Sequence, residues 1–201
     1  MYKQRDVETL WNKYSNLLSS LKSENVDNLI NSWDQRIIMG TYSQREKEPF
    51  CGIGGLVEYS LDLAKKSNEI SKALNYNINK VSIIKCSLLS IIGKVGNLTQ
   101  NRFVDCTSEW HQNKLGQYYD WNEECEKYQT TDMTLFILQR FNVDLSWEEW
   151  QAISLLKDLS SEDNKFYSDY KTHLTLVLQM AREAVIKEEK LKIIGTHTVP
   201  F

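Results

Sequence analysis

The sequence predicts an all-α protein, and three observations support that fold class. Only two prolines, Pro49 and Pro200, interrupt the 201 residues, so helices are permitted along most of the chain. Apolar residues recur at steps of three and four over several segments, which is the spacing of one helical face. No internal repeat or low-complexity linker divides the chain. These features favour a single α-helical domain.

Four helices are expected in the first half of the chain. The clearest periodicity lies in residues 7–21, where the apolar side chains trace one stripe of an α-helix. A shorter helix is expected around 26–38, and the charged, glycine-containing segment 39–52 is expected to be a loop. Helical spacing returns in residues 54–74. Residues 80–95 are so apolar that a helix there has little polar face and is expected at the centre of the core.

The second half combines an irregular insert with further helices. Residues 97–128 are rich in aromatic and polar side chains and have no helical period, so either one or two strands or an ordered surface loop is expected there. Ser146 followed by Glu149 forms a capping-box pattern, which predicts a helix start. Helical spacing marks three segments, 132–141, 146–159 and 169–192.

The expected organisation has three parts. Residues 1–25 form an extra N-terminal amphipathic helix, 26–192 form the main helical domain, and 193–201 form a C-terminal tail. The apolar stripe of the first helix either packs on its own domain, which is the commoner outcome, or forms the seam of a homodimer.

Charge and hydropathy exclude several classes of partner. The chain has 24 Lys and Arg against 27 Asp and Glu, a formal net charge of −3, and no basic run. Broad charge-driven binding to nucleic acid or anionic lipid is therefore not expected, although a local basic patch is compatible with this balance. No apolar stretch is long enough to span a bilayer, so we expect a cytoplasmic protein without a membrane partner.

The cysteines and histidines do not form a metal-binding or redox motif. The four cysteines contain no C-x-x-C pair, which excludes zinc-ribbon and thioredoxin-type spacing. In a chain of this size without a signal peptide we expect them to be reduced thiols. His111, His173 and His197 are scattered, so a histidine-rich metal centre is not expected.

Five short motifs occur in an order that resembles a known family. They are GGLVEYSL at 54–61, SLLSIIGKVG at 87–96, LGQYY at 115–119, FILQRF at 136–141 and LSWEEWQAI at 145–153. In this order and spacing they are similar to the landmarks of HD-domain phosphohydrolases, particularly the small versions of bacteriophages and prophages. The resemblance covers roughly residues 26–190 and implies an HD-domain-like helical bundle.

The resemblance also implies that the metal chemistry of this family is lost. In HD domains, His and Asp side chains hold divalent metals that activate water for attack on a phosphoester. The corresponding positions here are occupied by Tyr59, Ser90, Ile91, Thr130, Leu156 and Arg182. None of these side chains is a suitable ligand for such a cation. We therefore expect a pseudoenzyme with no catalytic residues, no metal and no cofactor, in which Tyr59 and Leu156 fill the former pocket.

Three residues are candidate contacts for a ligand in this pocket. Lys94 follows the altered His-Asp position and either meets a phosphate or is a solvated charge at a helix end. Arg182 either places its guanidinium in the pocket, paired with Asp132 or Glu58, or lies on the surface beside Glu183. Asp132 is the third candidate.

The aromatic insert supplies a candidate interface. Its members are Trp110, Tyr118, Tyr119 and Trp121. Aromatic side chains are enriched at interface hot spots, so these residues are expected either to dock a protein or to wrap the helical core.

Two functional hypotheses follow. The first is a catalytically inactive HD-fold protein, encoded by a phage and acting in the host cytoplasm, that binds a host or phage macromolecule or a nucleotide in a regulatory or inhibitory role. A protein is its first expected partner, with a nucleotide or nucleic acid next. The alternative is a phosphohydrolase acting on nucleotides or nucleic acid with a relocated site, for which Lys94, Asp132 and Asp158 are candidates. A structural component of a virion is a third, weaker hypothesis.

Overall fold

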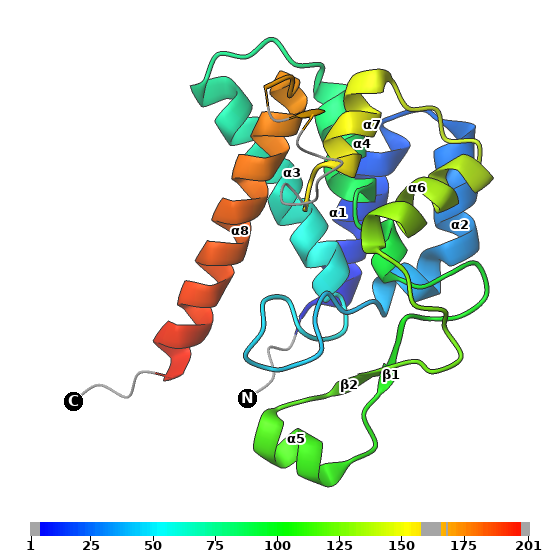
Figure 1. Cartoon of the computed structure of the whole chain (residues 1–201), viewed down its shortest axis with the longest axis vertical. Coiled ribbons are helices and arrows are strands. Elements are labelled where there is room, and N and C mark those ends of the chain that lie inside the picture. Colours follow the sequence, from blue (N-terminus) through cyan, green and yellow to red (C-terminus); the bar gives the residue numbers. More distant parts are fainter. Residues whose placement is uncertain (1–4, 158–165, 168, 198–201) are drawn as a thin grey trace.

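A computed structural model of the protein describes residues 5–157, 166, 167 and 169–197, and Figure 1 shows its arrangement. Helices dominate the fold, with one short antiparallel sheet. The α-helices are α1 (Val7–Ser19), α2 (Glu24–Ile38), α3 (Gly55–Ala73), α4 (Lys80–Leu89), α5 (Glu109–Leu115), α6 (Thr130–Arg140), α7 (Trp147–Ser154) and α8 (His173–His197). A 3-10 helix, η1 (Ile92–Lys94), follows α4, and the strands are β1 (Phe103–Asp105) and β2 (Tyr119–Trp121).

Helix α1 belongs to the same core as the rest of the bundle. Asp6 caps its N-terminus by accepting a hydrogen bond from the Thr9 amide at 3.0 Å. Tyr14 and Leu18 on its apolar stripe are buried against the central helices. The Tyr14 hydroxyl donates to the Leu88 carbonyl of α4 at 2.9 Å. The apolar stripe that the sequence predicts therefore packs against other helices of the same chain.

Helices α3 and α4 lie at the centre, and α3 packs on both α4 and α8. Helix α3 starts in close contact with the preceding loop. A side chain at Gly55 would place its Cβ 2.0 Å from the Phe50 carbonyl oxygen, so only glycine fits this position.

The expected continuous helix over 80–95 is wrong, because α4 ends at Leu89. The chain leaves helical geometry at Ile91, whose φ and ψ are −117° and 15°, and continues as η1. Helix α6 crosses at this point. A Cβ at Gly93 would lie 2.4 Å from the Thr130 carbonyl oxygen, and the Gly93 amide donates to the Thr134 hydroxyl at 3.0 Å. The break thus brings residues 90–94 directly against the first turn of α6.

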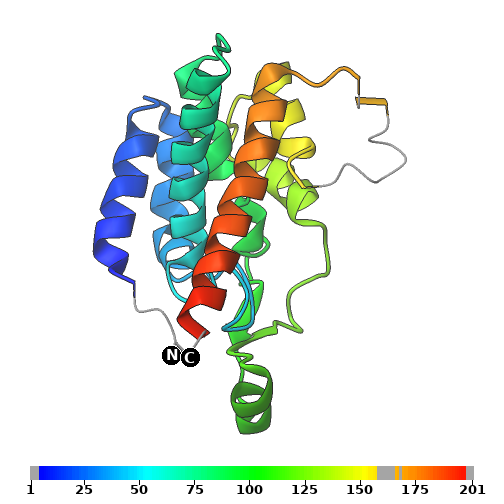
Figure 2. The ribbon, with the colours of Figure 1, turned by 90° about the vertical axis from the view of Figure 1, so that its left-hand side faces the viewer.

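The aromatic insert contains both strands and a short helix, which settles the question that its irregular pattern leaves open. Strands β1 and β2 pair antiparallel, with Phe103 opposite Trp121. Helix α5 connects them and has no buried residue. Figures 1 and 2 show this hairpin projecting from one end of the bundle.

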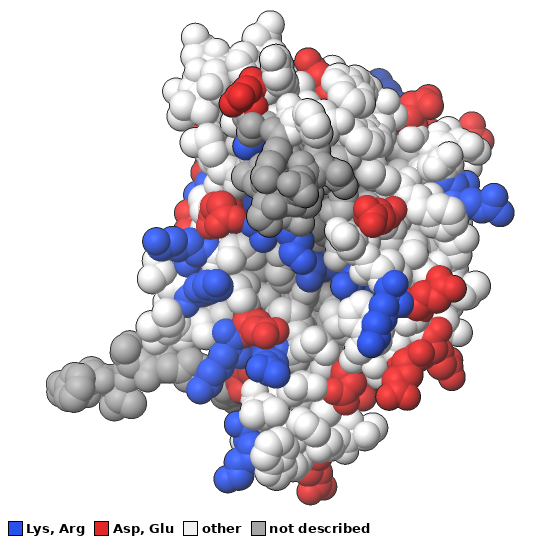
Figure 3. All heavy atoms as spheres, viewed as in Figure 1, with Lys and Arg blue, Asp and Glu red and all other residues white. Residues whose placement is uncertain are grey.

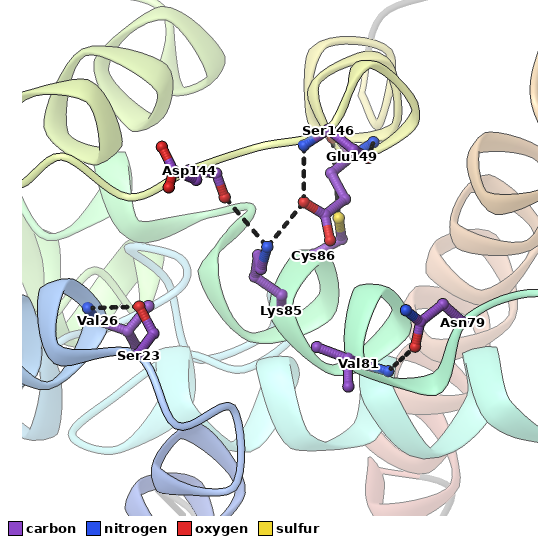
Figure 4. A network of polar contacts seen from close by, with 9 residues as sticks. All are labelled: Ser23, Val26, Asn79, Val81, Lys85, Cys86, Asp144, Ser146 and Glu149. Atoms are coloured by element: carbon purple, nitrogen blue, oxygen red, sulfur yellow. Dashed lines mark hydrogen bonds and ion pairs between the residues drawn. The ribbon is translucent and has the colours of Figure 1, made fainter.

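A buried ion pair ties α7 to α4 (Figure 4). Lys85 Nζ lies 2.8 Å from Glu149 Oε2, which also accepts a hydrogen bond from the Ser146 amide at 3.0 Å. Glu149 is only 3% exposed, and its partner Lys85 also donates to the Asp144 carbonyl. Ser146 and Glu149 form the capping box that the sequence predicts.

Helix α7 is shorter than expected, and α8 is shifted toward the C-terminus, because it begins at His173 and not near residue 169. The sequence pattern extends the first to 159, whereas α7 ends at Ser154; positions 158 and 159 lie outside the described residues. The Gln179 side chain of α8 donates to the Leu155 carbonyl at 2.6 Å, which satisfies a backbone group at the end of α7. Helix α8 continues to His197, past the expected boundary at 192.

Two further properties of the fold concern membrane crossing and the state of the cysteines. Within the described ranges, no helix has both the length and the apolar character that a membrane crossing requires. The four cysteines are buried free thiols, as expected for a chain of this size.

Candidate anion-binding site

The six positions that the HD-domain resemblance assigns to a metal site lie around one small cavity. Its volume is about 20 Å³, and α3, α6, α8 and the segments that follow α4 and α7 all contribute to its wall. The cavity is lined by Tyr59, Ser90, Ile91, Thr130, Leu156 and Arg182, together with Tyr42, Lys94, Thr131 and Lys157. We call this space the inner cavity. Residues that are distant in the sequence are thus brought together at a single place.

Aromatic rings occupy one side of the inner cavity. The Tyr59 ring stacks on the Tyr42 ring with centroids 4.4 Å apart, and Phe50 packs edge-on against Tyr59 at 5.5 Å. Tyr59 is fully buried and Leu156 is 5% exposed, so both fill space at this wall with apolar atoms.

Two hydroxyl groups at this wall have no hydrogen-bond partner among the described residues. They are Tyr59 Oη and Ser90 Oγ, on side chains that are 0% and 3% exposed. Burial raises the pKa of Tyr59 well above its ordinary value, so its phenol keeps its proton at neutral pH. Leaving a buried hydroxyl unpaired costs about 1–3 kcal/mol. A ligand that accepts hydrogen bonds from these groups would recover that energy.

Four cationic side chains surround the same region. Lys94, Lys157 and Arg182 line the inner cavity, and Arg102 lies beside it. Burial, together with the positive charges of the other three side chains, lowers the pKa of Lys94 to about 7, while Glu48 opposes the shift. The charged form of Lys94 is therefore disfavoured both by the loss of water and by a positive local potential.

A larger cavity of about 250 Å³ adjoins the inner one, with which it shares Thr130, Thr131 and Lys157. Its remaining lining residues are Arg102, Tyr128 and Gln129. We call it the outer cavity. Within the described part of the chain, no Asp or Glu lines either cavity. In the view of Figure 3, several Lys and Arg side chains lie across the middle of the face that is drawn, with Asp and Glu side chains near them.

The aromatic hairpin holds Arg102 in place. The Arg102 guanidinium lies 4.5 Å from the ring centroid of Trp121 and 5.1 Å from that of Tyr128. Its Nη1 donates to the Thr130 hydroxyl at 2.8 Å. These contacts orient the cation toward the first turn of α6.

The N-terminus of α6 adds to the positive potential. Thr130 and Thr131 open this helix of 11 residues, and its N-cap residue Gln129 makes no capping hydrogen bond with its side chain. The first amide groups of a helix carry partial positive charge and favour anions. Hydroxyls, cations and helix amides thus converge on one pair of cavities, a donor set that suits an anion.

The candidate ligand contacts are not all placed together. Lys94 and Arg182 line the inner cavity, whereas Asp132 is exposed in the first turn of α6 and is not in the wall of either cavity. Arg182 forms an ion pair with its neighbour Glu183. Glu58 pairs with Arg5 at 2.5 Å. Asp158, a candidate for a relocated site, lies outside the described residues.

The candidate interface residues also differ in position. Trp110 lies on α5 and is 60% exposed. Tyr118, Tyr119 and Trp121 are partly buried, and Trp121 packs edge-on against Phe103 at 6.0 Å. The Trp121 ring packs against the guanidinium of Arg102. Trp110 is the only one of these four residues that is largely exposed to solvent.

Sequence reasoning missed Arg102, Lys157, Tyr42 and Thr131. Arg102 precedes a strand in a segment without periodicity, so no pattern placed it near α6. Thr131 could have been suspected, because its neighbour Thr130 is one of the positions that the HD-domain resemblance selects. Lys157 could be suspected for the same reason beside Leu156.

Comparisons with known proteins add no relative. No protein-family model, curated protein or solved structure matches the chain. Across the residues that the structure describes, no group of three or more His, Cys, Asp or Glu side chains is arranged to hold a metal ion.

Proposed function

We propose that the chain is a non-catalytic HD-domain-like protein of the small bacteriophage type, which acts in a regulatory role by binding a phosphate-bearing ligand. A nucleotide is the ligand that we propose, with its phosphate in the outer cavity. The observation that carries this proposal is the convergence of Lys94, Arg102, Lys157 and Arg182 on two adjoining cavities without a carboxylate in their described lining.

The outer cavity has the size and the groups for such a ligand. A volume of about 250 Å³ is close to the lower end for small-molecule sites, and it accommodates a phosphate with part of a nucleoside. Arg102 supplies a planar donor, which suits phosphate oxygens, and Lys157 supplies a point charge. Thr131 and the first amides of α6 add neutral donors.

The competing hydrolase hypothesis requires an acid or base close to the bound phosphate. Its candidate Asp132 lies exposed outside both cavity walls. The side chains that line the cavities instead donate hydrogen bonds or carry positive charge, which supports binding of a phosphate more than activation of water.

Calorimetric titration with adenosine 5′-monophosphate and with inorganic phosphate at fixed ionic strength tests the proposal. We expect both to bind the wild-type protein, and Arg102→Gln or Lys157→Gln to weaken binding about tenfold to a hundredfold, because each removes a charge-assisted hydrogen bond worth about 1.5–3 kcal/mol. Arg140→Gln is the matched control, since it makes the same charge change in the last turn of the same helix, α6.

The proposal fails if neither anion binds the wild-type protein. It also fails if Arg140→Gln weakens binding as much as the pocket variants do, because the effect would then come from overall charge. Turnover of the nucleotide by the wild-type protein would overturn the non-catalytic assignment.

A further inference from the structure

We propose that the inner cavity is a second, separate binding site, which holds a single monoatomic anion such as chloride. This inference goes beyond the phosphate-bearing ligand, which occupies the outer cavity. Size, unpaired donors and charge each support it.

The size of the inner cavity selects a small occupant. A cavity needs about 10–15 Å³ to hold one water molecule, and the inner cavity has about 20 Å³. Chloride is only slightly larger than water, whereas phosphate and sulfate carry four oxygens around a central atom. The inner cavity therefore admits one monoatomic ion and excludes a polyatomic oxyanion.

The inner cavity offers hydrogen-bond donors that the protein does not use. Tyr59 Oη and Ser90 Oγ are buried and unpartnered, and both residues line the cavity. The Thr130 hydroxyl accepts a hydrogen bond from Arg102, which leaves its own proton to donate. Each hydroxyl can also serve as an acceptor, so the donors alone would suit water as well as an anion.

The charges decide between water and an anion. Lys94, Lys157 and Arg182 line the inner cavity, and no carboxylate is among its described lining residues. Lys94 Nζ is held by the Tyr42 carbonyl at 2.6 Å, so it cannot swing freely into solvent. The nearest acids act from outside the lining, Glu48 on Lys94 and Glu183 on Arg182. A bound anion favours the charged form of Lys94 and offsets its repulsion with Lys157 and Arg182, which a neutral water molecule does not.

Thermal unfolding in sodium chloride and in sodium gluconate at equal ionic strength provides the test. Gluconate is too large for the inner cavity and therefore controls for screening. We expect the wild-type Tm to be higher in chloride and to rise with chloride concentration as a single saturable site predicts. Bromide should reproduce the effect and give one anomalous-scattering peak within contact distance of Ser90 Oγ in crystals of the protein.

Three variants separate a bound ion from a general salt effect. Tyr59→Phe and Ser90→Ala each remove one donor and should weaken chloride binding about tenfold, while their Tm in gluconate is equal to or above that of the wild type. Ser154→Ala is the matched control, because Ser154 Oγ is also buried without a partner but does not line the inner cavity. It should leave the chloride response unchanged.

The outcome is independent of the phosphate proposal. Arg102 does not line the inner cavity, so Arg102→Gln should weaken phosphate binding about tenfold to a hundredfold and keep a saturable chloride response. The inference is overturned if chloride and gluconate give the same Tm, if Ser90→Ala responds to chloride like the wild type, or if bromide is absent from the inner cavity.

Discussion

Lys94 and Tyr42 form the contact on which the electrostatics of the site depend. Lys94 Nζ donates to the Tyr42 backbone carbonyl at 2.6 Å and lies 4.0 Å from the centroid of the Tyr42 ring. Both interactions hold the amine among Arg102, Lys157 and Arg182. A cation is thus kept beside other cations, which is unfavourable for the protein alone and favourable for an anionic ligand.

The stability of the protein should depend on pH through Lys94. Its pKa in the folded protein is about 7, against an ordinary value of 10.5, so between these values the unfolded chain binds more protons. The stability of the folded protein therefore rises with pH over this window. The destabilisation caused by the buried charge of Lys94 is fully present below pH 7. Lys94→Met should raise the free energy of unfolding by about 3–4 kcal/mol at pH 6, and much less at pH 10.5.

Urea titrations at both pH values check this prediction. Lys114→Met is the control, because Lys114 is exposed on α5. If Lys94→Met raised the free energy of unfolding equally at pH 6 and pH 10.5, improved packing, and not removal of a buried charge, would explain the effect.

Binding of phosphate should drive proton uptake near pH 8. Phosphate in the outer cavity offsets the positive charges of Arg102 and Lys157, which lower the pKa of Lys94. The pKa of Lys94 therefore rises, and an amine that is mostly neutral at this pH takes up a proton. The other charged or titratable groups that act on it are Tyr42, Glu48, Arg102, Lys157 and Arg182. Calorimetry in two buffers of different ionisation enthalpy measures the uptake, which should disappear in Lys94→Met. An uptake that persists in this variant would assign the proton to another group.

Gly93→Ala should disturb the first turn of α6. The added methyl group would lie 2.4 Å from the Thr130 carbonyl oxygen and 2.7 Å from the Thr134 amide nitrogen, so the backbone must shift. We expect a loss of stability of about 1–3 kcal/mol and weaker phosphate binding. Gly195→Ala is the control, since a Cβ added to Gly195 would meet no atom within 4 Å. Unchanged stability and binding in Gly93→Ala would contradict the close crossing of η1 and α6.

Tyr14→Phe tests whether α1 is an integral part of the domain. The variant removes the hydrogen bond to the Leu88 carbonyl and should lower the free energy of unfolding by about 1 kcal/mol in a single cooperative transition. Hydrogen exchange would reveal separate unfolding of α1 as an early loss of protection in residues 7–19 alone. That result would contradict α1 as an integral part of the domain.

The sequence predicts helices such as α1 and α2 well because each of these two buries one apolar face. The stripe of α1 and the capping box of Ser146 and Glu149 are local patterns, and both are present. The errors arise where distant segments meet. Helix α4 is interrupted because α6 crosses at Gly93, and no local pattern contains that contact.

The candidate site was predictable only in part. The family resemblance selected Tyr59 on α3, Ser90 just after α4 and Arg182 on α8, which all line the inner cavity. Arg102 reaches the site through contacts with Trp121 and Thr130, and these depend on the fold of the hairpin. The positive charge of the site was hidden in a chain whose net charge is −3.

Phosphorus NMR of adenosine 5′-monophosphate titrated with the protein tests the central claim most directly, because one spectrum reports both binding and hydrolysis. We expect a saturable shift or broadening of the nucleotide signal and no new inorganic phosphate signal. With Arg102→Gln the same change should require about tenfold to a hundredfold more protein. An unchanged nucleotide signal would contradict the binding site, and growth of the inorganic phosphate signal would contradict a non-catalytic protein.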